Sequence, residues 1–374
     1  MRASSPELLS RLSACVLLLA TSACGGGAGP SLPPPPTPDL GGADGGVSDL
    51  GPDVDLGADV DLGADVDLGS EPIDLGTEPI DLGPTPTLSP PDGAGPYVVS
   101  RMAGTTGSTS MTVYDPTLPA GQLAPIAIFL AGFQLHISNY DALCMRVASH
   151  GVIVVGVEAP SGGIIPSADH VALRDSAIAA LDWARTTAPS ATHTDLTHTL
   201  VFGHSMGGKV ATMIAAADGR VTALLGIDPV NAGSPLTGYS ATLPDVVPDA
   251  VTPLTIPVAF LGETTNGTGG LGGMSCAPAA QNFQTFYAAA TGTAWAAQYD
   301  FTGADHMDFV PDTTGCGFAC TACTAGTATP ATVVSSMETL VVAFAQRHLF
   351  GNVAAEVWLT GASVPAGVVA SHRP

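Results

Sequence analysis

From residue 97 onward, short apolar runs alternate with segments in which apolar residues recur at helical spacing. Residues 125–130 and 152–157 are almost entirely apolar, which is the pattern of strands buried on both faces of a parallel sheet. Further strands are predicted at 110–114, 199–203, 223–227, 257–261 and 297–301, and helices at 140–149, 171–185, 207–217, 281–289 and 333–348. Because strands and helices alternate, we predict an α/β fold over residues 96–352, with a mostly parallel sheet flanked by helices. Residues 353–374 are expected to form a C-terminal tail.

Residues 24–95 show no such periodicity and are rich in Pro, Gly and Asp. The tripeptide Asp-Leu-Gly recurs there, beginning at Asp49, Asp55, Asp61, Asp67, Asp74 and Asp81. A tract of this composition cannot bury enough apolar surface to offset the entropy lost on ordering, so we expect a disordered, self-repelling linker. Asp and Gly also build calcium-binding repeats, but the usual glycine-rich nonapeptide pattern is absent, which favours the linker.

Residues 1–23 have the features of an export signal. Arg2 and Arg11 flank its start, and the apolar run over 12–20 is too short to span a bilayer comfortably. Cys24 follows three small residues and resembles the lipidated cysteine of bacterial lipoproteins. We therefore expect a protein of the bacterial cell envelope, periplasmic or at the cell surface, whose contact with the membrane is a lipid anchor at Cys24. Simple secretion is the alternative, because Thr21 stands where Leu is usual.

The charge of the chain bears on whether it could bind nucleic acid. The chain has 33 acidic and 10 basic residues and a formal net charge of -23, and the stretch 31–96 contains no Lys or Arg. No basic cluster occurs anywhere, so a nucleic-acid partner is not expected.

Of the seven cysteines, Cys15 and Cys24 belong to the expected export signal and its end, which leaves five that could form disulfides. Three of them form a Cys-x3-Cys-x2-Cys pattern over 316–323, which is compatible with a metal site or with disulfides. Export favours disulfides, so we expect no metal. Cys144 lies in an apolar helical pattern and is the cysteine that we expect to be free and buried.

The clearest chemical signal is the sequence Gly-His-Ser-Met-Gly over 203–207, placed directly between a predicted strand and a predicted helix. In this context the glycines permit a sharp turn that holds Ser205 in a strained conformation above the sheet. The helix that follows directs its positive end toward the serine oxygen. Ser205 is therefore the candidate nucleophile.

A serine nucleophile needs a histidine base and an acid that orients it. His306 follows a predicted strand and lies in a loop, whereas His348 falls in the last predicted helix and His372 near the end of the chain. For the acid we prefer Asp228, at the end of one strand and before a proline. Glu263, after the next strand, is the alternative acid.

The oxyanion formed during ester cleavage needs two backbone N–H donors. We expect one from Met206, immediately after the nucleophile, and one from Phe133, in the loop that follows the strand 125–130. Gly132 lets that backbone approach the substrate, and the ring of Phe133 would form the floor of an apolar pocket. Gly132, Phe133 and His204 are the residues that we expect to line the substrate site.

These segments resemble the chlorophyllase family of α/β-hydrolases. The likeness is carried by Phe-Leu-Ala-Gly-Phe over 129–133, Ala-Ser-His-Gly over 148–151, the motif that extends through Lys209, Gly-Ile-Asp-Pro-Val over 226–230, and His-Met-Asp over 306–308. The resemblance implies an α/β-hydrolase fold and the triad Ser205, Asp228 and His306. Met206 and residues 148–151 are equally similar to cutinase-like polyester hydrolases, which carry their acid at the position of Asn266.

The sequence therefore predicts a serine carboxylic ester hydrolase that cleaves small apolar esters through an acyl-enzyme intermediate, without a cofactor. Two alternatives are kept: a lipase or cutinase-like polyester hydrolase, and a non-catalytic surface binding protein on a hydrolase scaffold. Completeness of the triad favours catalysis, because a scaffold that has lost activity usually lacks one member.

Overall fold

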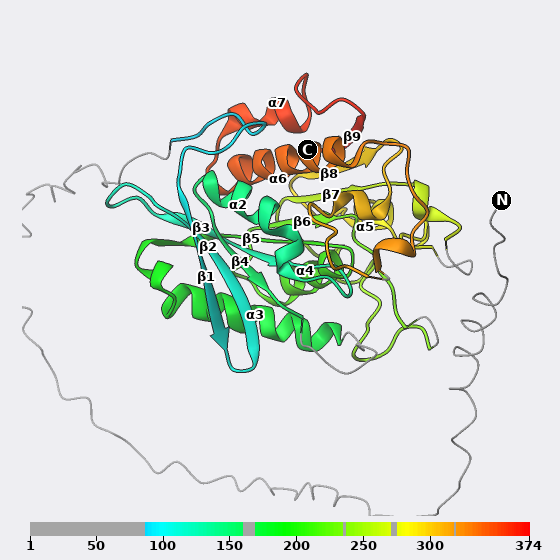
Figure 1. Cartoon of the computed structure of the whole chain (residues 1–374), viewed down its shortest axis with the longest axis horizontal. Coiled ribbons are helices and arrows are strands. Elements are labelled where there is room, and N and C mark those ends of the chain that lie inside the picture. The colour runs from blue at the N-terminus through cyan, green and yellow to red at the C-terminus, as the bar shows by residue number, and fades with distance from the viewer. Residues whose placement is uncertain (1–86, 160–168, 235–236, 271–274, 318) are drawn as a thin grey trace, which may run out of the picture. The chain divides into compact units, whose positions relative to one another are not determined.

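A computed structural model describes residues 87–159, 169–234, 237–270, 275–317 and 319–374 of the chain (Figure 1). The expected export signal, Cys24 and the Asp-Leu-Gly repeats lie outside the described residues. Within the described part of the chain, no helix has both the length and the apolar character needed to cross a membrane.

Nine strands of the described chain form one sheet in the order β1-β2-β4-β3-β5-β6-β7-β8-β9. Their bounds are β1 Val99–Thr106, β2 Thr109–Pro116, β3 Ala124–Leu130, β4 Ile153–Val157, β5 Thr194–His204, β6 Ala223–Ile227, β7 Val258–Gly262, β8 Ala296–Phe301 and β9 Val368–Arg373. Strands β3 to β8 are paired in parallel, while β1, β2 and β9 join antiparallel at the two edges. The predicted mostly parallel sheet is confirmed.

Helices cover both faces of the sheet (Figure 1). Their bounds are α2 Asp141–Ser149, α3 His170–Thr186, α4 Met206–Ala217, α5 Phe283–Ala289, α6 Pro330–Leu349 and α7 Glu356–Leu359. Short 3-10 helices are η1 Ile137–Tyr140, η2 Pro189–His193, η3 Thr265–Gly267, η5 His306–Phe309, η6 Ala319–Thr321 and η7 Val353–Ala355. Helices α2 and α6 pack on one face, and α3, α4 and α5 pack on the other.

The alternation of side chains along β3 explains why two cores form. Ala127 and Phe129 point into the core beneath α2 and α6, whereas Ile126, Ile128 and Leu130 point into the core beneath α3 and α4. All five side chains are fully buried. Each large one contributes about 1.5–3 kcal/mol by leaving water. A run that is apolar at every position thus fixes β3 in the middle of the fold.

Helix boundaries follow ordinary signals. The side chain of Asp169 accepts a hydrogen bond from the N–H of Ala172 at 2.8 Å and begins α3. Pro330 occupies the first turn of α6, where its missing N–H costs nothing. Gly351, with φ of +66°, follows the end of that helix.

Both ends of the domain differ from the sequence-based boundaries. The side chain of Gln346 donates to the carbonyl of Ser89 at 2.8 Å, and Arg146 donates to the carbonyl of Pro91 at 2.8 Å, so residues from 89 onward pack on the domain. The expected tail contains α7 and β9, and β9 pairs with β8 along its whole length.

Four cysteines of the described chain form two disulfides, in agreement with the prediction that disulfides are present. Cys276 is bonded to Cys323, and Cys316 is bonded to Cys320. Cys144 is free and buried, as expected.

Candidate active site

Ser205 stands at the junction of β5 and α4 in a conformation that few residues adopt. Its φ is 56° and its ψ is -121°. A backbone of this kind costs about 1–3 kcal/mol and persists only where the surroundings enforce it. A Cβ on Gly207 would lie 2.2 Å from the carbonyl oxygen of Leu130, and one on Gly203 would lie 2.6 Å from the backbone of Gly207. The two glycines of the motif are therefore required by close packing of the turn.

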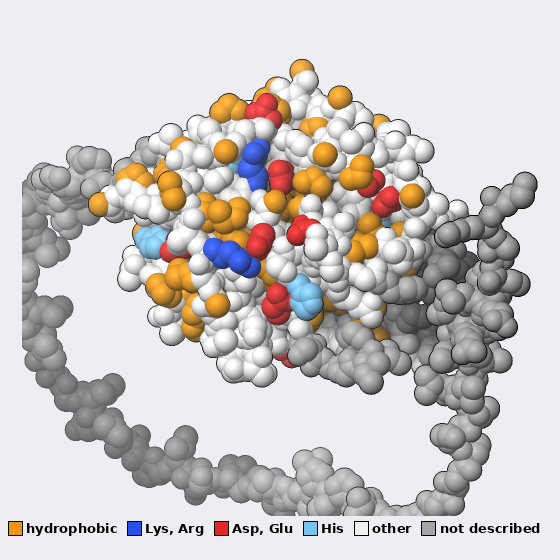
Figure 2. Space-filling model, viewed as in Figure 1, with side chains coloured by type: hydrophobic (Ala, Val, Ile, Leu, Met, Phe, Trp, Pro, Cys, Tyr) orange, Lys and Arg blue, Asp and Glu red, His pale blue; other side chains and the backbone are white. Residues whose placement is uncertain are grey.

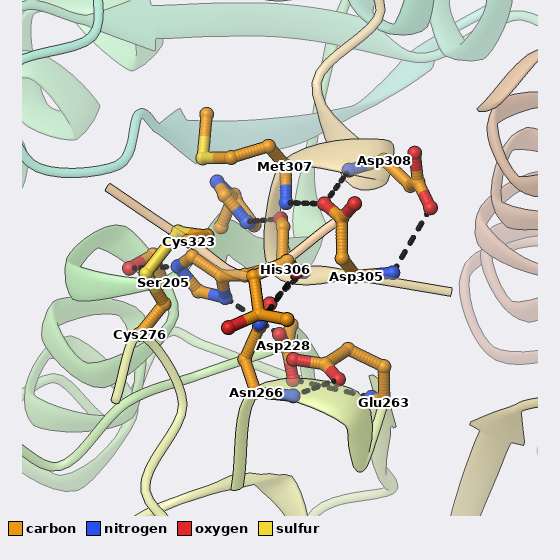
Figure 3. A network of polar contacts seen from close by, with 12 residues as sticks. Ser205, Asp228, Glu263, Asn266, Cys276, Asp305, His306, Met307, Asp308 and Cys323 are labelled. Carbon is orange, nitrogen blue, oxygen red and sulfur yellow. Dashed lines mark hydrogen bonds and ion pairs between the residues drawn. A yellow bond between two sulfur atoms is a disulfide. The ribbon is translucent and has the colours of Figure 1, made fainter. Parts of the chain in front are cut away.

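Three side chains from three different strand ends form one hydrogen-bonded chain (Figure 3). His306, which begins η5 after β8, places Nε2 2.9 Å from Oγ of Ser205 and Nδ1 2.6 Å from Oδ2 of Asp228. Asp228 follows β6 and is completely buried. Because an ionised carboxylate only accepts hydrogen bonds, Nδ1 of His306 carries the proton and Nε2 accepts from the serine hydroxyl.

The loop that carries His306 is held by two neighbouring aspartates. The carboxylate of Asp305 accepts from the N–H groups of Met307 and Asp308, and Asp308 accepts from the N–H of Asp305 at 2.9 Å. Asp305 also accepts from the N–H of Gly326 at 2.7 Å. These carboxylates therefore stabilise the turn through backbone N–H groups. Among the hydrogen bonds of the described residues, none joins either carboxylate to the imidazole ring of His306.

Glu263, the alternative acid, lies behind Asp228 and makes no hydrogen bond to His306. Its N–H donates to Oδ1 of Asp228 at 3.3 Å, and its Oε2 accepts from the N–H of Asn266 at 2.8 Å. Burial, followed by the nearby charge of Asp228, raises the pKa of Glu263 to about 8. The raised pKa favours the protonated form of Glu263 near neutral pH, whereas Asp228 is the carboxyl group bonded to the histidine.

Gly132 brings the loop after β3 against the nucleophile. A Cβ at this position would lie 3.4 Å from Cβ of Ser205 and 3.0 Å from Nδ1 of His204. Phe133 follows and is 42% exposed. Met206 begins α4, so its N–H belongs to the helix N-terminus, where no carbonyl of the helix itself is available to it. Both expected oxyanion donors thus belong to segments that border Ser205.

His204 differs from the expectation that it would contact substrate, because its side chain is fully buried. Its Nε2 lies 3.1 Å from the carbonyl oxygen of His306 and its Nδ1 lies 2.6 Å from the hydroxyl of Tyr140. Since a carbonyl only accepts, Nε2 donates to it and Tyr140 donates to Nδ1. Burial lowers the pKa of His204, so the ring stays neutral. His204 therefore helps to fix the backbone of His306 through this hydrogen bond.

One group in the described part of the chain has the composition of a metal site. It consists of Asp228, Glu263 and His306, whose possible ligand atoms all lie within 4.8 Å of one another. In this arrangement Nδ1 of His306 already donates to Asp228, and burial favours the protonated form of Glu263. Neither group is then in the form that binds a metal ion, and we assign no metal to this group.

Comparisons with known proteins identify relatives of this chain. A model of the chlorophyllase family matches residues 98–362. The chain is 31% identical over 210 residues to chlorophyllase-1 of Arabidopsis thaliana, covering 50% of this chain and 60% of that protein. It is 29% identical over 204 residues to the chloroplastic chlorophyllase-1 of Citrus sinensis (52% and 58%) and 28% identical over 209 residues to chlorophyllase-2 of Arabidopsis thaliana (51% and 62%).

The chain thus spans about 60% of the length of the curated relatives that it matches. The family model, by contrast, extends from the first strand of the sheet to beyond α7 and includes Ser205, Asp228 and His306. On the strength of that match, this chain belongs to the chlorophyllase family of α/β-hydrolases.

Proposed function

We propose that this protein is a serine carboxylic ester hydrolase of the cell envelope, held there by a lipid anchor at Cys24, that cleaves small apolar esters. The observation that carries the proposal is the hydrogen-bonded chain from Ser205 through His306 to Asp228, with 2.9 Å and 2.6 Å between the bonded atoms. A serine at its own pKa is a poor nucleophile, and this arrangement supplies the base and the acid that it needs.

In the proposed reaction, Oγ of Ser205 attacks the ester carbonyl while its proton passes to Nε2 of His306. Asp228 keeps the ring in the correct tautomer and stabilises the imidazolium that forms. The N–H groups of Met206 and Phe133 bind the oxyanion. The imidazolium then gives its proton to the departing alcohol, and a water molecule, activated by the same histidine, releases the acid from the acyl-enzyme.

The surroundings favour neutral, apolar substrates. Lys209, in the first turn of α4, is fully buried and donates to the carbonyl of Ala232 at 2.8 Å, so it is not available to an anionic substrate. On the face shown in Figure 2, the few basic side chains lie beside acidic ones. Arg101 pairs with Asp141 at 3.2 Å. Phe133 follows Gly132, which packs against Ser205, and its half-exposed ring offers apolar contact to a substrate.

The test is hydrolysis of p-nitrophenyl esters with short, medium and long acyl chains by the full chain and by its Ser205→Ala variant. Native activity should exceed that of the variant by more than about 10⁴-fold, because the attacking oxygen is lost. A fluorophosphonate probe should label the native protein and not the variant. Chlorophyll, from which the relatives take their name, is tested as one further ester with the same two proteins.

Other outcomes would redirect the proposal. Equal activity of the two proteins, or neither hydrolysis nor labelling by the native protein, would favour a binding protein on this scaffold. Activity restricted to long-chain or polymeric esters would favour a lipase or polyester hydrolase.

A further inference from the structure

A second layer of polar groups lies behind the three proposed catalytic residues, and Asn266 is at its centre (Figure 3). Asn266 lies in η3, the turn after β7, and is 1% exposed. Its Oδ1 accepts from the backbone N–H of His306 at 2.7 Å, and its Nδ2 donates to the carbonyl of Thr324 at 2.8 Å. One side chain therefore joins the turn after β7 to both ends of the loop that carries His306.

Asn266 is itself fixed by the turn to which it belongs. Its backbone N–H donates to Oε2 of Glu263 at 2.8 Å, and Glu263 is fully buried. The disulfide between Cys276 and Cys323 links the same two segments, next to Thr324. The amide thus lies in a rigid frame that a covalent bond reinforces.

His306 is held at both backbone ends as a result. Asn266 accepts from its N–H, and His204 donates to its carbonyl at 3.1 Å, while the ring is bonded to Asp228. With the backbone fixed on both sides, the ring has little freedom to move away from Ser205. A displacement of about 1 Å at a reacting group can cost about 10²-fold in rate.

We propose that Asn266, held by Glu263, is a positioning residue that aligns His306 with Ser205, a role that rests on the proposed hydrolase function. The position requires an amide, because it needs one acceptor for the N–H of His306 and one donor for the carbonyl of Thr324. An apolar residue would leave both groups buried and unpaired. A carboxylate would face the carbonyl of Thr324 without a proton to donate and would add charge beside Asp228.

The experiment compares native full-length protein with Asn266→Leu, which keeps the number and branching of the side-chain heavy atoms and removes both hydrogen bonds, and with Asn266→Ala, which removes them without adding bulk. Asn282→Ala is the matched control. Asn282 is also 1% exposed and lies on the same connection between β7 and β8, but its side chain accepts from the N–H of Gln284 at the start of α5. Circular dichroism identifies conditions in which each variant is folded.

Three readouts follow for the folded proteins. For both Asn266 variants, kcat should fall about 10²-fold with KM little changed, because the base is misaligned while the substrate contacts remain. The midpoint of the pH dependence of fluorophosphonate labelling should shift. The low-field proton resonance of Nδ1–H of His306 should move or broaden. The Asn282 variant should lose thermal stability and change none of these three.

Native kcat and an unchanged low-field resonance in Asn266→Leu would overturn the proposal. So would equal losses in the Asn282 variant, since these would reflect general destabilisation. The resonance is observed without any ester, so it still decides the role of Asn266 if no substrate is turned over. Failure of the hydrolase proposal would instead appear as native protein that neither labels nor hydrolyses.

Discussion

Replacing Glu263 by Gln should stabilise the protein increasingly as the pH rises. Glu263 is fully buried, and the titratable groups that face it are Asp228, Asp305 and His306. Burial and then the charge of Asp228 raise its pKa from 4.5 to about 8. In the unfolded chain the same carboxyl is solvated and loses its proton near 4.5.

The sign follows from proton binding. Between pH 4.5 and about 8 the folded state holds a proton that the unfolded state has released, so the free energy of unfolding falls across this range. The rise in pKa corresponds to an upper limit of about 5 kcal/mol, fully developed above pH 8 and absent below pH 4.5. Gln does not titrate and avoids this loss. Its amide would face a site where Oε1 of Glu263 has no hydrogen-bond partner, a cost of about 1–3 kcal/mol that does not vary with pH.

The measurement is urea unfolding of native protein and Glu263→Gln at several pH values from 5 to 8.5, with the disulfides intact. The difference in free energy of unfolding, variant minus native, should increase by several kcal/mol across the series. Glu356→Gln, at a partly exposed carboxylate paired with Arg347 at 2.9 Å, is the control and should show no such increase. A Glu263→Gln difference that stays constant with pH would refute the reasoning.

Two further predictions concern the same region. Asp228→Asn should lower kcat by about 10⁴-fold, since the histidine would be held in the wrong tautomer, and Glu263→Gln should lose far less; the reverse ranking in an esterase assay would make Glu263 the acid. Breaking the bond between Cys276 and Cys323, whose sequence separation is 47, should cost about 4 kcal/mol and lower the melting temperature by several degrees. The bond between Cys316 and Cys320 closes a far shorter loop, so replacing both of these cysteines by Ser should lower the free energy of unfolding by less. A melting temperature that reductant does not change would argue against a structural role for either bond.

Sequence patterns predicted the central strands because those strands are buried on both faces. Strands β3, β4, β6 and β7 are buried at every position, which leaves an uninterrupted apolar run in the sequence. Strands β1 and β9 alternate between exposed and half-buried positions and lie at the edges of the sheet. Their sequences carry no apolar run, so their pairing depends on neighbours that the pattern does not reveal.

The residues of the candidate site also differ in whether the sequence alone can predict them. Ser205 and His306 could be placed from a local motif and from chain order, because the fold dictates which strand ends carry them. Sequence patterns do not reveal the contacts of Asn266 and Tyr140, because their side chains bond to residues that lie 40 and 64 positions away in the chain. From the sequence, His204 is expected among the residues of the substrate site, but its fully buried ring packs against Tyr140 and Phe309. A local motif therefore predicts which residues lie in the site, whereas their side-chain contacts depend on the packing of the whole domain.

Strand β9 determines which strand forms the open edge of the sheet near the loop that carries His306. The strand that leads to His306 is β8, and all six of its residues are paired with β9. Without that partner, β8 would present a row of free N–H and C=O groups directly beside the histidine loop, a template on which another molecule could add a strand. The polar side chains of Ser371, His372 and Arg373 make β9 a poor template in turn. Strand β9 thus moves the open edge of the described sheet one strand away from the loop that carries His306.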